Sequence, residues 1–242
     1  PNLGYEFCQG YYSRVTNRLH GRVTRLYFTP LIRSLQQIAG AHPLLTFLDS
    51  FRYPLAGEFA MVRDLAWINR VPGDWGLEVG VLSEIYRNCA LRRICQADIA
   101  DAYEHKHQGL SADNAEQGLQ KMCVDITKSL FRNLASEGVV LSEAVLKTLW
   151  ATYLQAAQEA ITRYQNDAAI NSLQFDRHAE RMAVEVFLKG MKIATEAFLE
   201  DPLGVPMISN WSRVTGAIPD IFERLIGAVE RDHEWDPVGD RV

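Results

Sequence analysis

The distribution of apolar residues divides the chain into two parts. Up to about residue 110 the apolar runs are short and are broken by glycine, proline and charged residues. Farther along, apolar residues recur every three or four positions, as at Leu119, Met122 and Ile126, so that they share one face of a helix. The pattern predicts an α/β protein, α+β within this chain, with a mixed part at residues 1–110 and a helical part at residues 111–242.

Short elements of both kinds alternate in the first part. Short or alternating apolar runs predict strands at Tyr5–Tyr12, Leu44–Phe51 and Arg93–Ala100. Helical spacing predicts helices at Thr24–Ile38, Met61–Ile68 and Val79–Cys89. The second part is predicted to hold four amphipathic helices, at Asn114–Leu134, Ser142–Asn166, Asp176–Leu199 and Ile218–Val229.

Composition and charge exclude several classes of protein. The 242 residues are 48% hydrophobic and 23% charged, which suffices for a sizeable buried core. A formal net charge of -5 argues against a nucleic-acid-binding surface, because such a surface needs concentrated basic residues. No stretch approaches the roughly 18 apolar residues that a membrane helix needs, and the first residues lack a signal pattern. We therefore expect neither nucleic acid nor a membrane as a partner.

The cysteines and the first residues bear on where the protein works and how long it is. The four cysteines have no Cys-x-x-Cys spacing, and a chain of this length needs no disulfide framework, so we expect reduced thiols in a cytoplasmic protein. The segment Pro1–Gly4 does not resemble an initiation sequence. We therefore expect the chain to be part of a longer protein.

A basic segment between the first strand and the first helix is a candidate anion site. Ser13–Arg18 and Leu19–Thr24 combine arginines, hydroxyl groups and a glycine. Guanidinium groups offer a planar fork of donors, and glycine lets the main chain approach a ligand, so the segment can cradle a phosphate or a carboxylate. The same composition is typical of a solvated loop before a helix, and the sequence leaves both interpretations open.

Two further segments place carboxylates beside glycines and aromatic residues. These are Pro54–Phe59 and Asp74–Gly80, both at breaks in the apolar pattern, where loops that meet at a site are common. Glu78 falls in the first turn of a predicted helix. There a carboxylate is also favoured by the helix dipole, so its role is either to hold a ligand or to stabilise the helix start.

Two histidines form the candidate metal site. His105 and His107 lie in the segment Tyr103–Gln108, at the end of a predicted strand. Alternate side chains of a strand point to one side, so both imidazoles can face the same ion. Surface histidines also produce this spacing by chance. The charge run Asp176–Arg181, in contrast, is interpreted as the solvated face of a helix with ion pairs along it.

Taken together, four segments resemble one family of enzymes. The segments are Gly21–Thr24, Pro54–Glu58, Trp75–Gly80 and Tyr103–Gln108, and they occur in the family's order. The family is that of the glucosyl-3-phosphoglycerate and mannosyl-3-phosphoglycerate synthases, retaining glycosyltransferases of family 81 with a GT-A fold. The resemblance covers roughly residues 10–110. It implies that this part belongs to the acceptor- and metal-binding part of a GT-A catalytic domain, followed by a helical C-terminal region.

The resemblance also implies roles for particular residues. The loop Gly21, Arg22, Val23 and Thr24 is expected to bind the phosphate and carboxylate of 3-phosphoglycerate. Leu55 and Glu78 are expected at the catalytic centre, with the backbone of Leu55 near the reacting carbon and Glu78 holding sugar hydroxyls. The other substrate-binding positions are Ala56, Gly57, Trp75 and Tyr103. A divalent metal, Mg²⁺ or Mn²⁺, is expected to bind His105 or His107.

The implied reaction is transfer of a hexose, glucose in the first instance, from a nucleoside diphosphate sugar to the 2-hydroxyl of 3-phosphoglycerate, with retention. The alternatives are mannosyl transfer to the same acceptor, and a non-catalytic helical protein that binds a phosphorylated metabolite. No Asp-x-Asp motif or glycine-rich nucleotide loop occurs in the sequence. We therefore expect the nucleotide-binding half of the enzyme to lie outside this chain, and we expect a homodimer through the long amphipathic helices.

Overall fold

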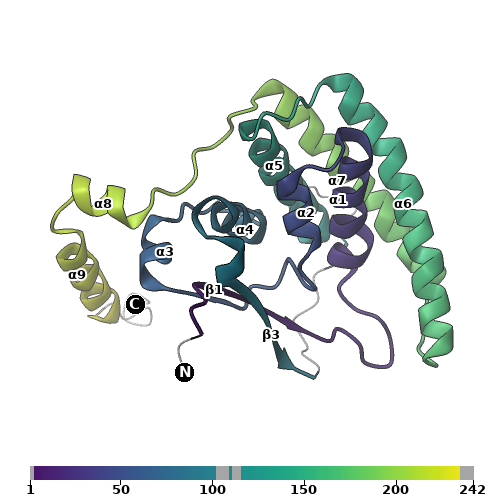
Figure 1. Cartoon of the computed structure of the whole chain (residues 1–242), viewed down its shortest axis with the longest axis horizontal. Helices are drawn as coiled ribbons and strands as arrows, with labels where there is room; N and C mark the ends of the chain where they lie inside the picture. The colour runs from purple at the N-terminus through teal and green to yellow at the C-terminus, as the bar shows by residue number, and fades with distance from the viewer. Residues whose placement is uncertain (1–2, 102–108, 111–115, 235–242) are drawn as a thin grey trace, which may run out of the picture.

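The computed structural model describes residues 3–101, 109–110 and 116–234. Its sheet consists of β1 (Phe7–Tyr12), β2 (Phe59–Met61) and β3 (Ile94–Ala100), in the order β2-β1-β3. The central strand β1 pairs antiparallel with β2 and parallel with β3. Figure 1 shows β1 and β3 along the lower edge of the molecule, with helices above them. This small mixed sheet under many helices is an α+β architecture, as predicted.

Most helices lie where the apolar spacing predicts them. In the first part they are a π-helical turn η1 (Val23–Phe28) that continues into α1 (Thr29–Ala39), then α2 (Pro43–Asp49), α3 (Arg63–Ile68), α4 (Leu77–Asn88) and a 3-10 turn η2 (Leu91–Arg93). In the second part they are α5 (Gly118–Ser136), α6 (Glu143–Ile170), α7 (Arg177–Glu200), α8 (Trp211–Ala217) and α9 (Ile221–Glu234). The short helix α8 and the strand β2 were not predicted.

One predicted element is wrong. The apolar run Leu44–Phe51, predicted as a strand, forms the helix α2. Pro43 begins the helix, where its fixed φ suits the first turn and its missing N–H costs nothing. The four buried side chains of this helix follow helical spacing: Leu44, Leu45, Phe47 and Leu48. A short apolar run is compatible with either structure, and here the packing against α1 and α4 decides for the helix.

A single hydrophobic core joins the two parts of the chain. Tyr27, on the helical turn before α1, is fully buried and lies 5.6 Å from the ring of Tyr153 and 5.5 Å from that of Phe187. Its hydroxyl donates to the carbonyl of Cys123 at 3.2 Å, and the hydroxyl of Tyr153 donates to the carbonyl of Leu26 at 2.9 Å. The boundary predicted near residue 110 therefore does not divide the core, since α5, α6 and α7 pack on α1 and the turn before it.

The last two helices lie apart from this core. In Figure 1 an extended segment leads from α7 to α8 and α9, which lie on the left beside α3. Trp211 and Phe222 stack with their ring centroids 5.4 Å apart, and Trp67 of α3 lies about 6 Å from both. Asn210 caps α8 and also donates to the carbonyl of Ile68 at 3.0 Å. Aromatic packing thus attaches the end of the described chain to the first part.

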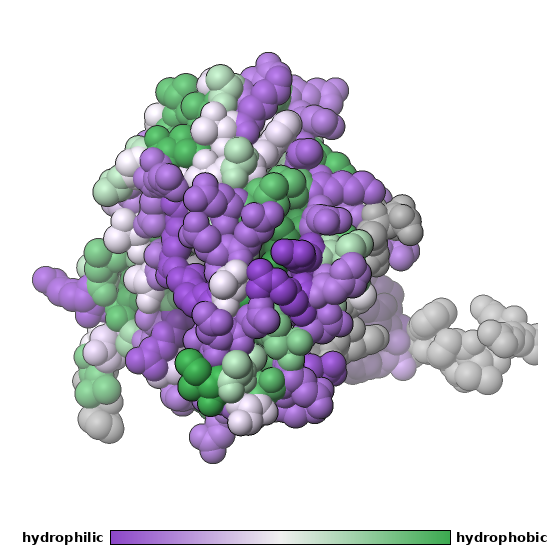
Figure 2. Space-filling model, turned by 90° about the vertical axis from the view of Figure 1, so that its right-hand side faces the viewer, coloured by the Kyte–Doolittle hydropathy of each residue, from purple (hydrophilic) through white to green (hydrophobic). Residues whose placement is uncertain are grey.

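Figure 2 looks at the side of the molecule on which α6 lies in Figure 1, and most of that surface is hydrophilic, with scattered hydrophobic patches. The outer side of α6 agrees with this view, because its buried residues follow one stripe of the helix. In the described residues no helix is long and apolar enough to cross a membrane.

Candidate functional site

A pocket of about 520 Å³ opens between the first part of the chain and α5. Its walls come from four segments that lie far apart in the sequence. One wall is the end of β1 and the basic segment, a second is the loop before β2, a third is the start of α4, and a fourth is one face of α5. The lining residues are Tyr12, Arg14, Arg18, Leu19, His20, Gly21, Arg22, Val23, Thr24, Tyr53, Leu55, Gly57, Glu58, Trp75, Glu78, Leu119, Met122 and Ile126.

The basic segment is held in one conformation by its own backbone. The amide of His20 donates to the carbonyl of Arg14 at 2.8 Å, which closes a tight loop. Gly21 follows with a φ of +71°, a conformation that other residues rarely adopt. The chain then enters the helical turn at Val23, and the amide of Arg25 donates to the carbonyl of Gly21 at 3.0 Å. Arginines and the start of a helical turn therefore lie together on this wall, a combination that suits an anion.

Arg22 lines the pocket, and an ion pair with α7 holds its Nε in place. Its Nε donates to Glu180 Oε1 of α7 at 2.8 Å. The side chain of Arg22 is 36% exposed, whereas that of Glu180 is only 6% exposed. The charge run Asp176–Arg181 was interpreted as a solvated face, and for Glu180 this is wrong. Its helix turns it inward against the basic segment, where two arginines satisfy the carboxylate.

Two carboxylates line the same pocket as the arginines. Glu58 accepts a hydrogen bond from the hydroxyl of Tyr12 at 3.1 Å. Glu78 lies near Gly57, since a Cβ atom added to that glycine would come within 3.9 Å of Glu78 Oε1. Burial raises the pKa of Glu78 above its usual value, and the negative charge of Glu58 adds to the rise, whereas a hydrogen bond from its own backbone amide opposes it. The arrangement offers acceptors for hydroxyl groups, which suits a sugar.

Tyr53 links the acidic and basic sides of the pocket. Arg14 Nη1 donates to the hydroxyl of Tyr53 at 3.1 Å, and the rings of Tyr12 and Tyr53 meet edge to face at 5.3 Å. Burial raises the pKa of Tyr53, against the opposing effects of Arg14 and of a hydrogen bond from Thr24. Tyr53 therefore stays protonated and fixes the position of Arg14 relative to the two carboxylates.

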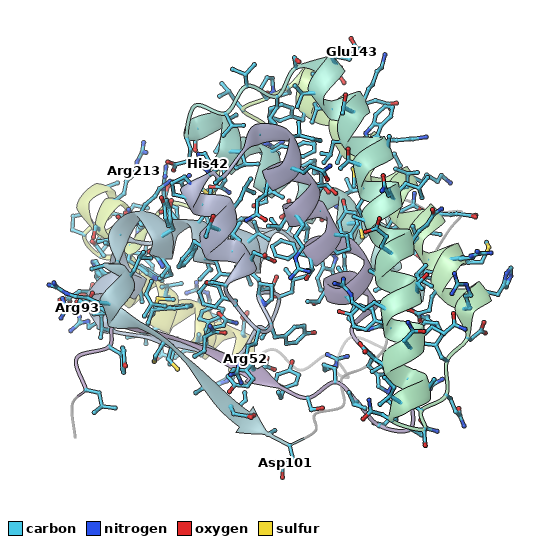
Figure 3. The ribbon with its side chains drawn as sticks, turned by 45° about the vertical axis from the view of Figure 1, so that its right-hand side comes forward. His42, Arg52, Arg93, Asp101, Glu143 and Arg213 are labelled. Carbon is cyan, nitrogen blue, oxygen red and sulfur yellow. The ribbon has the colours of Figure 1, made fainter. Side chains whose placement is uncertain are left out.

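The loop that carries Leu55 and Gly57 is anchored to the sheet. The amide of Arg52 donates to Gln96 Oε1 of β3 at 2.8 Å, and Arg52 Nη1 donates to the hydroxyl of Tyr11 at 2.7 Å. Figure 3 shows Arg52 close to the strands, between Arg93 and Asp101, which mark the two ends of β3. The sheet therefore acts as a support for the catalytic loop that the sequence predicts.

The sequence locates part of this pocket. Eight of the predicted site residues line it: Gly21, Arg22, Val23, Thr24, Leu55, Gly57, Trp75 and Glu78. Ala56 does not line it, because its side chain is buried and its carbonyl accepts from Gln9 Nε2 at 2.8 Å. Tyr103, His105 and His107 lie outside the described residues.

Other lining residues were not predicted to be part of the site. Arg14, Arg18 and Glu58 lie in segments that the sequence did single out, so their composition already carried the signal. The face of α5 that closes the pocket has ordinary core spacing, and nothing in the sequence distinguishes it from the rest of the helix. It consists of Leu119, Met122 and Ile126.

The prediction of a metal site is not supported by the described residues alone. They contain no group of three or more His, Cys, Asp or Glu side chains close enough to hold an ion. Glu58 and Glu78 supply oxygen donors of the kind that Mg²⁺ and Mn²⁺ prefer, but two carboxylates do not complete a coordination sphere. The predicted histidine ligands lie outside the described residues, so the metal site stays a prediction.

Replacing Glu78 with glutamine is expected to stabilise the fold at neutral pH. The pKa of Glu78 is raised in the folded chain, so its ionised form costs stability, and that cost grows as pH rises through the folded pKa. The gain should be on the order of 1 kcal/mol near pH 7.5, or about 3 °C in Tm, and should shrink towards pH 4. Thermal unfolding at both pH values measures it.

A matched control is Glu143→Gln. Glu143 also lies in the first turn of a helix, but Lys147 holds its pKa below the usual value, so this change should lower Tm at neutral pH. If Glu78→Gln also lowered Tm, then Glu78 would act mainly by stabilising the start of α4 through the helix dipole.

Comparison with known proteins places the chain in a family. It is 53% identical over 236 residues to the glucosyl-3-phosphoglycerate synthase of Persephonella marina, a match that covers 98% of this chain. The chain belongs to the glucosyl-3-phosphoglycerate synthase family. The enzyme of that name from Methanococcoides burtonii is 41% identical over 234 residues, or 95% of this chain. No protein-family model matches the chain.

The family members are longer than this chain, which spans 58% and 57% of these two relatives. Among solved structures, mannosyl-3-phosphoglycerate synthase from Rubrobacter xylanophilus is 25% identical, with a TM-score of 0.45 over 58% of this chain and 40% of that one. Glucosyl-3-phosphoglycerate synthase from Mycobacterium tuberculosis, in complex with Mn²⁺, UDP-glucose and phosphoglyceric acid, is 21% identical, with a TM-score of 0.41 over 58% and 41%.

Proposed function

We propose that the full-length protein transfers glucose from a nucleoside diphosphate sugar to the 2-hydroxyl of 3-phosphoglycerate, with retention at the anomeric carbon. The observation that carries this proposal is 53% identity across 98% of the chain to an enzyme named for that product. The pocket supports it, because arginines and carboxylates line one cavity. Its volume of about 520 Å³ lies within the range of small-molecule sites.

In this proposal the basic and the acidic residues of the pocket hold different substrates. Arg22 and the amides that begin the helical turn bind the phosphate and carboxylate of the acceptor, since guanidinium groups and helix-start amides both favour anions. Glu58 and Glu78 accept hydrogen bonds from sugar hydroxyls, beside the backbone of Leu55. Much of the acceleration then comes from holding the acceptor hydroxyl in line with the anomeric carbon.

No protein base is required in this arrangement. In a retaining transfer, the leaving diphosphate can take the proton of the attacking hydroxyl on the same face of the sugar. The role proposed for Glu78 is accordingly to hold the sugar, which a partly buried hydrogen-bond acceptor can do. We also propose a GT-A fold for the whole catalytic domain, with the nucleotide half supplied by sequence beyond this chain.

The activity is further proposed to need Mg²⁺ or Mn²⁺, with His105 or His107 among the ligands. Such an ion neutralises charge on a leaving diphosphate when it is bound. Removal of divalent ions with EDTA should abolish transfer, and adding back Mg²⁺ should restore it. Transfer that continues at full rate after such treatment would contradict the requirement.

The proposed function is tested with the full-length protein, 3-phosphoglycerate and four donors: UDP-glucose, GDP-glucose, UDP-mannose and GDP-mannose. We expect a phosphorylated glucosyl product with the anomeric configuration of the donor, detected by NMR. A faster reaction with the mannosyl donors would favour the mannosyl alternative. No product from any donor would contradict the transferase proposal.

Two further properties are proposed. The exposed apolar residues of α9, among them Phe222, Ile226 and Val229, support a homodimer contact, which sedimentation at micromolar concentration tests; a monomer would contradict it. A cytoplasmic location agrees with the four cysteines, all of which are free thiols.

A further inference from the structure

We propose that Glu180, far along the chain on α7, is a positioning residue of the acceptor site. It orients the guanidinium of Arg22 toward the anion and contacts no substrate itself. This inference rests on the proposed function, because it assigns Arg22 to the anionic acceptor. Glu180 belongs to the helical part, where the sequence suggested only structural roles.

The contacts of Glu180 are directed at the basic wall of the pocket. Oε1 accepts from Arg22 Nε at 2.8 Å, and Oε2 accepts from Arg25 Nη2 at 3.1 Å. Both oxygens are therefore engaged, and the side chain is 6% exposed. Because a buried carboxylate keeps its charge only when it is paired, the two arginines and Glu180 form one unit with a net charge of about +1.

Arg25 attaches this unit to the loop itself. Its Nε donates to the carbonyl of His20 at 2.7 Å and its Nη2 to that of Leu19 at 3.4 Å. The guanidinium also lies 4.8 Å from the centroid of the Tyr164 ring. Burial lowers the pKa of Arg25, and Glu180 opposes that effect most strongly. Glu180 therefore stabilises the charge of a buried arginine that holds the loop carrying Gly21.

Arg22 differs from Arg25 because its two outer guanidinium nitrogens remain available to a ligand. Its Nε is bound to Glu180, whereas its Nη1 and Nη2 form no hydrogen bond with the described residues, and the side chain lines the pocket at 36% exposure. A guanidinium that is fixed at Nε can present its two outer nitrogens as a fork to a phosphate or a carboxylate. Orienting the fork before binding reduces the entropy lost on binding.

The test is steady-state kinetics of Glu180→Gln in the full-length protein. Glutamine keeps the size and one acceptor but removes the charge. We expect KM for 3-phosphoglycerate to rise about tenfold, with kcat and KM for the sugar nucleotide within about twofold of wild type. Glu180→Asp keeps the charge, so its KM for 3-phosphoglycerate should lie between those of wild type and Glu180→Gln.

Glu84→Gln is the matched control. Glu84 is also buried and pairs with two arginines, Arg70 and Arg87, but it does not line the pocket. Its loss should lower Tm without changing KM for the acceptor. If Glu180→Gln behaved like Glu84→Gln, lowering Tm with an unchanged KM, Glu180 would be a structural residue only and the proposal would be overturned.

A double-mutant cycle adds a second criterion. If Glu180 acts through Arg22, then Glu180→Gln should cost little acceptor affinity in an Arg22→Ala background. Fully additive losses would contradict that coupling.

Should the wild-type enzyme not use 3-phosphoglycerate at all, the proposed function fails, and the positioning role is then decided separately by calorimetry with inorganic phosphate. Weaker phosphate binding by Glu180→Gln than by wild type supports the role, and equal binding overturns it.

Discussion

Replacing Arg22 with alanine should lower kcat/KM for 3-phosphoglycerate by about 100-fold, since a hydrogen bond from a charged donor to an anion contributes roughly 1.5–3 kcal/mol and each 1.4 kcal/mol is tenfold. The loss should fall on the acceptor, with KM for the sugar nucleotide nearly unchanged. The fold should survive, because Glu180 keeps Arg25 as a partner at 3.1 Å. Initial rates at varied acceptor and donor concentrations measure the effect.

Two variants sharpen this prediction. Arg22→Lys keeps the charge but not the fork of donors, and Glu180 would have to share a single ammonium group with the ligand, so an intermediate loss is expected. Arg33→Ala removes an arginine that pairs with Asp49 and does not line the pocket, and it should leave the kinetics unchanged. If Arg22→Ala used the acceptor as well as Arg33→Ala does, Arg22 would have no part in binding it.

Replacing Gly80 with alanine should destabilise the fold by about 2–3 kcal/mol, or about 6 °C in Tm. Gly80 lies in the fourth position of α4, and a Cβ atom there would clash with Cδ and Cγ of Pro72. The ring of proline is fixed to its backbone and cannot rotate away. The segment that leads to Trp75 would therefore have to move, and urea unfolding should show the loss as a lower midpoint.

Gly216→Ala is the control for helix propensity. Gly216 lies in α8 with open space around the added methyl group, and alanine there should be neutral or stabilising by up to about 1 kcal/mol. If alanine lowers stability at Gly80 but not at Gly216, the loss at Gly80 is due to packing and not to helix propensity. Equal effects at both positions would show that Pro72 shifts at no cost.

The chemistry of the site could be predicted from short segments. Three segments stand out because arginines, carboxylates and glycines interrupt the apolar pattern there: Gly21–Thr24, Pro54–Glu58 and Trp75–Gly80. Such interruptions are common at functional sites. The structure brings members of all three segments to one pocket. Local composition marked these segments, because every feature that distinguishes them lies within a few positions, but it left open whether they bind a ligand. The resemblance to a family is what assigned them to one site.

Elements were predictable where the periodic pattern is long. The helices α5, α6 and α7 follow their apolar spacing over many turns, which leaves no alternative that would bury the same residues. The run Leu44–Phe51 is too short for this, and a helix and a strand both bury its side chains. Only the packing against α1 and α4 distinguishes the two.

The sequence by itself therefore determined the helical second half, the basic and acidic segments of the site, and the family. Tertiary structure alone decided which distant residues support that site. Glu180 lies 158 positions after Arg22, and the sequence predicts it as one charge on a solvated helix face. In the structure α7 turns it inward, and its Oε1 lies 2.8 Å from Arg22 Nε. The residues of α5 that line the pocket likewise carry no distinguishing signal in the sequence. The physical reason is the same for both: burial and pairing are set by the arrangement of whole helices, which local composition does not encode.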